Sequence, residues 1–197
     1  MNTIPGGVNT VRKCIIFDLD GTLVKLPIRY DIVQKKLKEL FKTESDLSPL
    51  IPSIIEKSNG NSSMINNAFE LICAEELIAS ESLEEIEGAT QLIEHLLARN
   101  YTISLVTLQC RKSTEIILRK LELFDKFSSI ITRDENHDRL TQIKKTNELL
   151  GFDPGNVIVI GDRINDINCA TKAGCTSILV NGTDIASKKL SELKNIL

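Results

Sequence analysis

The sequence predicts an α/β fold in which a doubly wound parallel sheet carries a small α-helical cap domain. Three observations support this prediction. Five short apolar segments, rich in β-branched residues, alternate with helical patterns. Acidic, basic and hydroxyl residues follow four of these segments at the point where each one ends. A further interval of roughly 60 residues holds helical patterns without a convincing strand, which predicts an insertion.

Five strand candidates define the predicted sheet. They are KCIIF (13–17), TISLVT (102–107), SSIIT (128–132), NVIVI (156–160) and TSILV (176–180). Each is almost continuously hydrophobic, as strands buried on both faces are. Helical patterns between them include 89–100, 114–124 and 140–151, and the last ends at Gly151, a common helix stop. Strand–helix alternation with short connections is typical of a parallel sheet covered on both sides.

The interval after the first strand has a different pattern. Apolar residues repeat every three to four positions, as at Val33 and Leu37 and again at Ala68 and Ile72. The segment is too long for an ordinary strand-to-helix connection. We therefore predict a core domain made of 1–24 and 87–197, and a helical cap domain made of 25–86.

Composition excludes several classes of protein. The net charge is −3 and no Lys/Arg block stands out, so nucleic acid is not an expected partner. No apolar run approaches membrane-spanning length, and the N-terminus lacks an apolar signal core. Five cysteines without C-x-x-C, and only two histidines, argue against a zinc site and a disulfide framework. We expect a cytoplasmic protein, monomer or homodimer, with Cys110 as a free thiol.

Polar residues gather where the predicted strands end. DLDGT follows the first strand, Thr107 ends the second, RDENHDR follows the third and GDRIND follows the fourth. Ligands of doubly wound sheets bind beyond the carboxyl ends of the strands. We therefore expect these side chains to form one site.

Four aspartates in these motifs suggest a metal site. Asp18 and Asp20 point to the same side if the chain stays extended, and two such carboxylates repel unless a cation intervenes. Asp162 and Asp166 add two carboxylates about one helical turn apart. Oxygen ligands without histidine or thiolate suit Mg²⁺ better than Zn²⁺. A turn or a helix cap remains the alternative for each motif alone. An EF-hand is disfavoured, since its glycine position would be Leu23.

DLDGT, a strand ending in Thr, and GDRIND, in this order, resemble the haloacid dehalogenase superfamily of phosphatases. The resemblance covers 13–22 and about 87–185, including EGATQLIEHLLARNYTISLVT and LLGFDPGNVIVIGDRINDINCATKAGC. It implies a Rossmann-like core and, by general layout, a phosphoglycolate phosphatase-like subgroup.

The resemblance also implies roles for the aspartates. Asp18 would be the nucleophile that becomes an aspartyl phosphate, and Asp20 the general acid and base. Mg²⁺ would be held by the Asp18 carboxylate, the Asp20 backbone carbonyl and Asp162, with Asp166 in support. An aspartate at position 20 favours phosphate-ester chemistry over carbon–halogen cleavage.

Phosphate-binding groups are implied in the same way. Thr107 would hydrogen-bond a phosphate oxygen, Leu108 follows it where the family often has Asn, and the Gly21–Thr22 turn would add backbone N–H donors.

The third family motif, usually a Lys in KP, is missing from TRDENHDRLTQIKK. Arg139 is the best positional match for it, although Arg and Lys are not equivalent. Lys144, Lys145 and His137 remain open as alternatives.

We therefore predict a Mg²⁺-dependent phosphomonoesterase that hydrolyses a small phosphorylated metabolite through an aspartyl-phosphate intermediate. The first alternative is a phosphotransferase of the same superfamily, such as a sugar phosphomutase, which returns the phosphoryl group to its substrate. A less favoured alternative is a non-catalytic phospho-binding protein, which would not need Asp20 as an acid.

Overall fold

A five-stranded parallel sheet forms the centre of the molecule in the computed structural model, which describes residues 12–181 and 187–197. Its strands are β1 (Cys14–Phe17), β4 (Thr102–Val106), β5 (Ser129–Ile131), β6 (Val157–Gly161) and β7 (Thr176–Leu179), in the order β5-β4-β1-β6-β7. All neighbouring pairs are parallel. The predicted fold class is confirmed.

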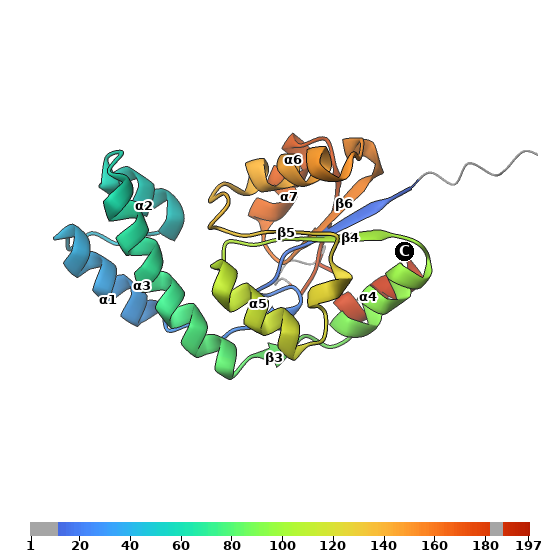
Figure 1. Ribbon diagram of the computed structural model, residues 1–197, viewed down its shortest axis with the longest axis horizontal. Coiled ribbons are helices and arrows are strands. Elements are labelled where there is room, and N and C mark those ends of the chain that lie inside the picture. Colours follow the sequence, from blue (N-terminus) through green and yellow to red (C-terminus); the bar gives the residue numbers. More distant parts are fainter. Residues whose placement is uncertain (1–11, 182–186) are drawn as a thin grey trace, which may run out of the picture.

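Helices cover both faces of this sheet (Figure 1). One face carries α4 (Ala89–Ala98), α5 (Arg111–Lys120) and the 3-10 helix η3 (Leu190–Asn195), which pack against Ile15 and Phe17 of β1. The other face carries α6 (Arg139–Leu150) and α7 (Ile164–Lys172), which pack against Cys14 and Ile16. Because successive side chains of a strand point to opposite faces, one four-residue strand belongs to two apolar cores. Two short 3-10 helices, η1 (Phe124–Lys126) and η2 (Pro154–Asn156), complete the connections.

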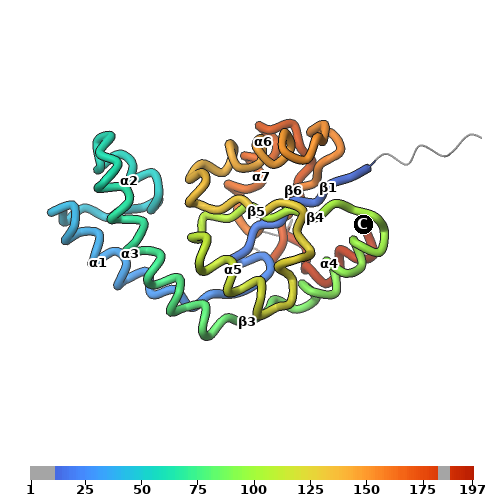
Figure 2. Tube along the Cα trace, in the orientation of Figure 1, coloured from blue at the N-terminus to red at the C-terminus, as the bar shows by residue number. Residues whose placement is uncertain are grey.

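Three helices follow the first strand and lie beside the sheet, not on it (Figure 2). They are α1 (Tyr30–Phe41), α2 (Leu50–Ser58) and α3 (Ser62–Glu81). Their inner faces form a separate apolar core that includes Val33, Leu37, Ile54 and Ile72. We call residues 26–83, which hold these helices, the helical insertion.

A two-stranded antiparallel sheet brackets the helical insertion, with β2 (Val24–Lys25) paired to β3 (Glu84–Glu85). The expectation that no strand occurs between Leu26 and Ile86 is therefore wrong for Glu84–Glu85. A pair of exposed glutamates has no apolar pattern that could predict a strand, and only pairing with β2 creates it. The division into domains at 25 and 86 remains a prediction, and residues 1–11 and 182–186 of the predicted core lie outside the described residues.

Within the described ranges, no helix is both long and apolar enough to cross a membrane.

Candidate active site

The carboxyl ends of β1, β4 and β6 lie in register, which brings their following residues together. Phe17 of β1 is opposite Leu105 of β4 and Ile160 of β6. The segments that begin with Asp18, Thr107 and Asp162 therefore leave the sheet at one edge. This is the edge at which doubly wound folds bind their ligands.

Asp18 is a buried carboxylate that continues the line of β1. Its backbone N–H donates to the Ile160 carbonyl at 2.9 Å, so β6 holds the residue after the strand has ended. Burial raises the pKa of Asp18 to about 7; Arg139 acts against this rise, and the neighbouring Asp166 and Asp162 add to it. Asp18 is thus a carboxyl whose ionisation depends on nearby cations.

Asp20 lies two residues on, at the start of the connection to the helical insertion. Its Oδ1 accepts a hydrogen bond from the Leu26 N–H at 3.0 Å. Burial raises the pKa of Asp20 to about 6, while the Leu26 N–H lowers it. A carboxyl with a pKa near neutrality can both give and take a proton, as general acid–base catalysis requires.

The turn after Asp20 differs from the prediction that Gly21 and Thr22 offer backbone N–H donors. The Gly21 N–H donates to the Val24 carbonyl at 2.7 Å, and the Thr22 N–H to the Leu19 carbonyl at 3.3 Å. These two donors are used inside the turn, because the chain reverses there to enter β2. By contrast, the Asp20 N–H donates to no described residue, and Asp20 lines the cleft described below.

Gly21 has a second role, which is to make room for Asp162. Its φ of +86° is in the left-handed region, and a Cβ there would lie 2.1 Å from Asp162 Oδ2. Gly161 similarly makes room for Asp166. A Cβ added at position 161 would lie 2.6 Å from the Cβ of Asp166. Both glycines therefore allow backbone and carboxylate to approach closely.

Three of the four predicted metal ligands form a cluster. Carboxylate oxygens of Asp18, Asp162 and Asp166 all lie within 4.8 Å of one another. The buried Asp162 Oδ1 has no hydrogen-bond partner among the described residues. Burial also raises the pKa of Asp162, with Asp166 adding to the rise. Clustered oxygens with an unsatisfied acceptor fit a hard cation such as Mg²⁺. The Asp20 carboxylate accepts from the Leu26 N–H and is not in this cluster, and the ligand predicted from Asp20, its backbone carbonyl, stays a prediction.

Arg139, the first residue of α6, lies against this cluster. Its Nη2 is 2.5 Å from Asp18 Oδ1, its Nε is 3.1 Å from Asp166 Oδ1, and its Nη1 donates to the Val106 carbonyl. Lys144 and Lys145, two of the alternatives, are exposed on the same helix. The planar guanidinium reaches two carboxylates and a carbonyl at once, which an ammonium group could not do in the same geometry.

Thr107 and Leu108 line the cleft next to Asp18. Thr107 is buried, its N–H donates to the Ile131 carbonyl, and its Oγ1 accepts from the Gln109 N–H at 3.1 Å. The Leu108 N–H donates to no described residue. The loop after β4 therefore offers one hydroxyl and one free backbone donor toward the acidic cluster.

A cleft of about 440 Å³ extends from this cluster to the helical insertion. Glu76, Tyr30 and Gln109 also line it, as do Arg133 and Arg163 from the RDENHDR and GDRIND motifs; the sequence assigned no role to any of these five residues. Arg133 lies where the RDENHDR motif places it, just after β5, but only its contact with Glu76 reveals its role. His137, the remaining alternative to Arg139, is exposed and lines the cleft beside Phe69.

Glu76 of α3 and Arg133, which follows β5, form a buried ion pair between the helical insertion and the five-stranded sheet. Arg133 Nη1 lies 2.6 Å from Glu76 Oε1, and Nη2 lies 3.0 Å from Oε2. Both side chains are nearly inaccessible, with exposed fractions of 1% and 3%. Glu76 also accepts the Cys110 N–H at 2.8 Å. The carboxylate is fully satisfied, as a buried charge must be.

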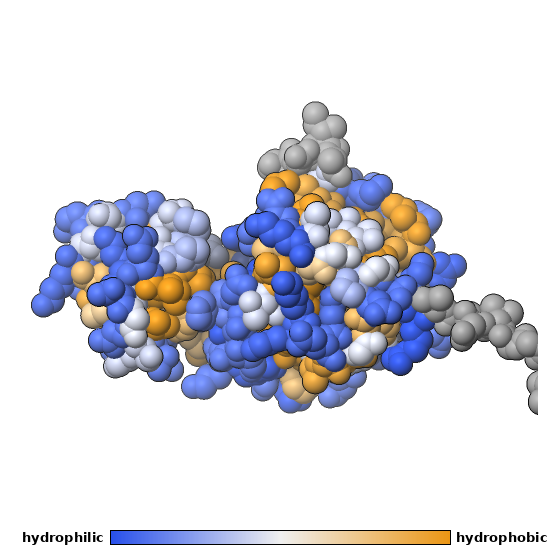
Figure 3. Space-filling model, turned by 90° about the horizontal axis from the view of Figure 1, so that it is seen from above, coloured by the Kyte–Doolittle hydropathy of each residue, from blue (hydrophilic) through white to orange (hydrophobic). Residues whose placement is uncertain are grey.

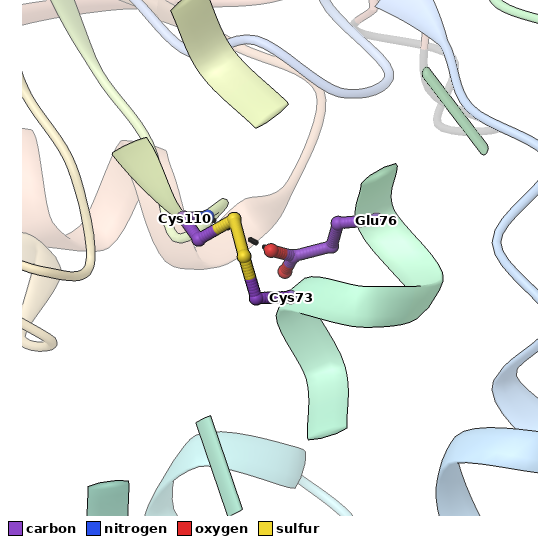
Figure 4. A group of neighbouring side chains, drawn as sticks. All are labelled: Cys73, Glu76 and Cys110. Carbon is purple, nitrogen blue, oxygen red and sulfur yellow. Dashed lines mark hydrogen bonds between the residues drawn. A yellow bond between two sulfur atoms is a disulfide. The ribbon is translucent and has the colours of Figure 1, made fainter. Parts of the chain in front are cut away.

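A disulfide lies beside Glu76 (Figure 4). It joins Cys73 of α3 to Cys110 of the loop after β4, with 5.6 Å between their Cα atoms. The expectation of a free Cys110 thiol is therefore wrong. The spacing of cysteines in the sequence cannot show this pairing, because the pairing depends on how α3 packs against α5. The free cysteines in the described part of the chain are Cys14, Cys169 and Cys175.

Fold and site together define a hydrolase with an acidic centre at the end of a doubly wound parallel sheet. Residues 15–180 match the family model of the haloacid dehalogenase-like hydrolases, and the chain belongs to this family. It is 26% identical over 216 residues to the pyrophosphatase PpaX of Bacillus cereus, with 96% of each chain covered.

Solved structures of the family are similar in fold. A hydrolase from Pseudomonas syringae superposes with a TM-score of 0.74 at 20% identity, over 93% of this chain and 97% of that one. A protein from Haemophilus somnus, described as a predicted phosphoglycolate phosphatase, has a TM-score of 0.65 at 17% identity, over 94% and 97% of the two chains.

Proposed function

We propose that the protein is a Mg²⁺-dependent phosphomonoesterase that hydrolyses a small phosphorylated metabolite through an aspartyl phosphate on Asp18. The observation that carries the proposal is the arrangement of Asp18, Asp20 and Arg139 around one end of the cleft. Membership of the hydrolase family and similarity to proteins named as phosphatases and pyrophosphatases support it.

The proposed reaction has two steps. Asp18 Oδ2, the oxygen that Arg139 does not hold, attacks phosphorus, and the bond from phosphorus to the leaving oxygen breaks. Asp20 gives its proton to that oxygen, so the product leaves as an alcohol. Asp20 then takes a proton from a water molecule, which attacks the aspartyl phosphate and releases phosphate.

Several groups would hold the transferred phosphate. The Thr107 hydroxyl and the N–H groups of Asp20 and Leu108 are the donors available around it. Arg139 orients Asp18 through their ion pair. The Asp18 and Asp162 carboxylates and the Asp20 backbone carbonyl would hold Mg²⁺, with Asp166 in support, and the ion would supply the positive charge that lets two anions approach each other.

We propose that the helical insertion acts as a cap, since it supplies one wall of the cleft. A cap that closes over the substrate excludes bulk water from the reactive phosphate. A cytoplasmic location and a monomeric or homodimeric state belong to the same proposal.

Replacement of the nucleophile tests the proposal. We expect Asp18→Asn to abolish Mg²⁺-dependent release of inorganic phosphate from p-nitrophenyl phosphate, while circular dichroism shows a folded protein. Wild-type turnover by this variant would refute the mechanism. Release of inorganic phosphate, as opposed to an isomerised sugar phosphate, separates hydrolysis from phosphoryl return.

A further inference from the structure

The wall that the helical insertion contributes to the cleft is apolar. Its lining residues are Ile28, Tyr30, Pro49, Leu50, Ile51, Pro52, Ile72 and Glu76. None of these described residues is a lysine or an arginine. Figure 3 shows hydrophobic side chains gathered where the smaller lobe faces the larger one. This wall lies opposite the acidic cluster, where the leaving group of a bound phosphate ester would extend.

The only charge on this wall is already neutralised. Glu76 is held by both terminal nitrogens of Arg133, and this pair is buried. Neither partner can turn to a charged ligand without leaving the other uncompensated in a dry environment, which is strongly unfavourable.

Two cations near the start of the helical insertion, Arg29 and Lys36, are also engaged elsewhere. Arg29 Nη2 and Lys36 Nζ each lie 2.7 Å from an oxygen of Glu75, and neither side chain lines the cleft. Lys35, Lys38, Lys42 and Lys57 do not line the cleft either, so the insertion places no lysine or arginine in the cleft lining.

Besides Arg133, two arginines line the cleft in the described chain, Arg139 and Arg163, and both lie on the opposite wall. Arg139 is paired with Asp18 and Asp166. Arg163 lies 4.0 Å from Asp162 and its side chain is 67% exposed, which makes it a cation of the rim. An anionic leaving group inside the cleft would therefore face apolar side chains, paired charges and the side chains of Gln109, His137 and Asn165, with Arg163 as an exposed cation at the rim.

We infer that the leaving group of the substrate is an uncharged, mainly apolar organic alcohol, and not a phosphate or a carboxylate-bearing group. This inference rests on the proposed phosphatase activity. The inferred substrate therefore differs from pyrophosphate and phosphoglycolate, the compounds to which the names of similar proteins refer. The residues that select the substrate are the apolar ones of the insertion, with Ile51 of α2 at the centre of the run Pro49–Pro52.

A series of alkyl monophosphates tests this inference, because the leaving alcohols have similar acidity and differ mainly in apolar surface. We expect kcat/KM with Mg²⁺ to rise about three- to fourfold for each added methylene from ethyl to butyl to hexyl phosphate. The kcat/KM for hexyl phosphate should exceed the values for phosphoglycolate and pyrophosphate by at least about tenfold. Only hexyl phosphate has a leaving group that buries apolar surface without bringing an unpaired charge into the cleft.

A charged substitution in the wall provides a second test. Ile51→Lys should reduce the ratio of hexyl to ethyl phosphate by about fivefold or more, because the new ammonium makes the wall polar. The same variant should raise kcat/KM for phosphoglycolate. Ile55→Lys is the matched control, as Ile55 is half-buried on the same helix but does not line the cleft.

Outcomes for the two proposals are distinguishable. An Asp18-dependent phosphatase with equal kcat/KM along the alkyl series, or with a preference for pyrophosphate or phosphoglycolate, overturns the inference and leaves the proposed function intact. Absence of hydrolysis of every phosphate tested refutes the proposed function, and the inference falls with it. Equal effects of Ile51→Lys and Ile55→Lys overturn the assignment of Ile51.

Discussion

Arg139 Nη2 lies 2.5 Å from Asp18 Oδ1, so the first residue of α6 holds the carboxylate at the end of β1. The same guanidinium contacts Asp166 and the Val106 carbonyl. Through these contacts, one side chain joins three segments of the sheet edge. This relationship makes Arg139 the cation that compensates the acidic cluster in the protein.

We expect Arg139→Ala to lower kcat/KM by about 10²–10³, the range seen when one preorganised donor is lost from an active site. Arg139→Lys should lie between wild type and alanine, because it keeps the charge and loses the planar contacts. Steady-state kinetics on p-nitrophenyl phosphate measures both. Lys144→Ala, an exposed change on the same helix, serves as control. Full activity of Arg139→Ala would remove this residue from the site.

Stabilisation by Mg²⁺ should depend on pH. Folding raises the pKa of Asp18 from 3.8 to about 7 and that of Asp20 from 3.8 to about 6. Between the unfolded pKa of 3.8 and the folded pKa values, the metal-free folded protein binds more protons than the unfolded chain. Its stability therefore falls as the pH rises from about 4 to 7. A cation that binds the ionised carboxylates offsets this loss.

Thermal unfolding at pH 5 and pH 8, with and without saturating Mg²⁺, measures the effect. We expect Mg²⁺ to raise the Tm clearly at pH 8 and little at pH 5. At a Mg²⁺ concentration of a hundred times its Kd, the free energy of unfolding at pH 8 should increase by about 2–3 kcal/mol. NaCl of equal ionic strength is the control. Asp162→Asn should remove most of the increase; an unchanged increase would place the cation elsewhere.

Gly21→Ala should disrupt the site. The added Cβ would lie 2.1 Å from Asp162 Oδ2, so Asp162 must move, and the φ of +86° adds strain. We expect loss of Mg²⁺ stabilisation and at least about tenfold lower kcat/KM, because small displacements of catalytic groups are costly. Gly60→Ala has a similar φ of +78° with nothing within 4 Å, and it should lower only stability, by about 1 kcal/mol. Equal activity of the two variants would contradict this prediction.

Glu75 and Glu76 are adjacent glutamates of α3 with different partners. Glu76 pairs with Arg133, which is 1% exposed, whereas Glu75 pairs with Arg29 and Lys36, which are 48% and 39% exposed. Glu76→Gln should therefore lower the free energy of unfolding by about 3 kcal/mol or more, since it leaves a buried guanidinium uncompensated. Glu75 is itself 2% exposed, but the cations that it would leave are half-exposed and can be solvated, so Glu75→Gln should cost less than Glu76→Gln. Urea denaturation compares them, and equal losses would show that the burial of Arg133 is unimportant.

The disulfide should stabilise the packing of the helical insertion against the loop after β4. Cys73 and Cys110 are 37 residues apart in the sequence, and a loop of that size is worth about 3–4 kcal/mol in the chain-entropy account. We expect dithiothreitol to lower the Tm of the wild type and to have no effect on Cys73→Ser. Cys169→Ser, which removes a free cysteine, should respond to dithiothreitol as the wild type does. Thiol counting under denaturing conditions checks the pairing directly.

The sequence by itself determined the sheet. Five runs of apolar, β-branched residues are visible in the sequence, and parallel strands buried on both faces need such runs. Polar motifs at their ends also predicted which edge of the sheet would collect the acidic residues. Strand ends are a local property of the chain, and the rule that parallel strands share one carboxyl edge carries them into three dimensions.

Only the tertiary structure decided which groups are free to act. The N–H groups of Gly21 and Thr22 look available in the sequence, but the reversal into β2 uses both inside the turn. Pairing of Glu76 with Arg133, and of Cys73 with Cys110, depends on the packing of α3 against α5 across long separations in sequence. Hydrogen bonds, buried charges and disulfides are satisfied by whatever the fold brings near, and a linear pattern of residue types does not contain that information.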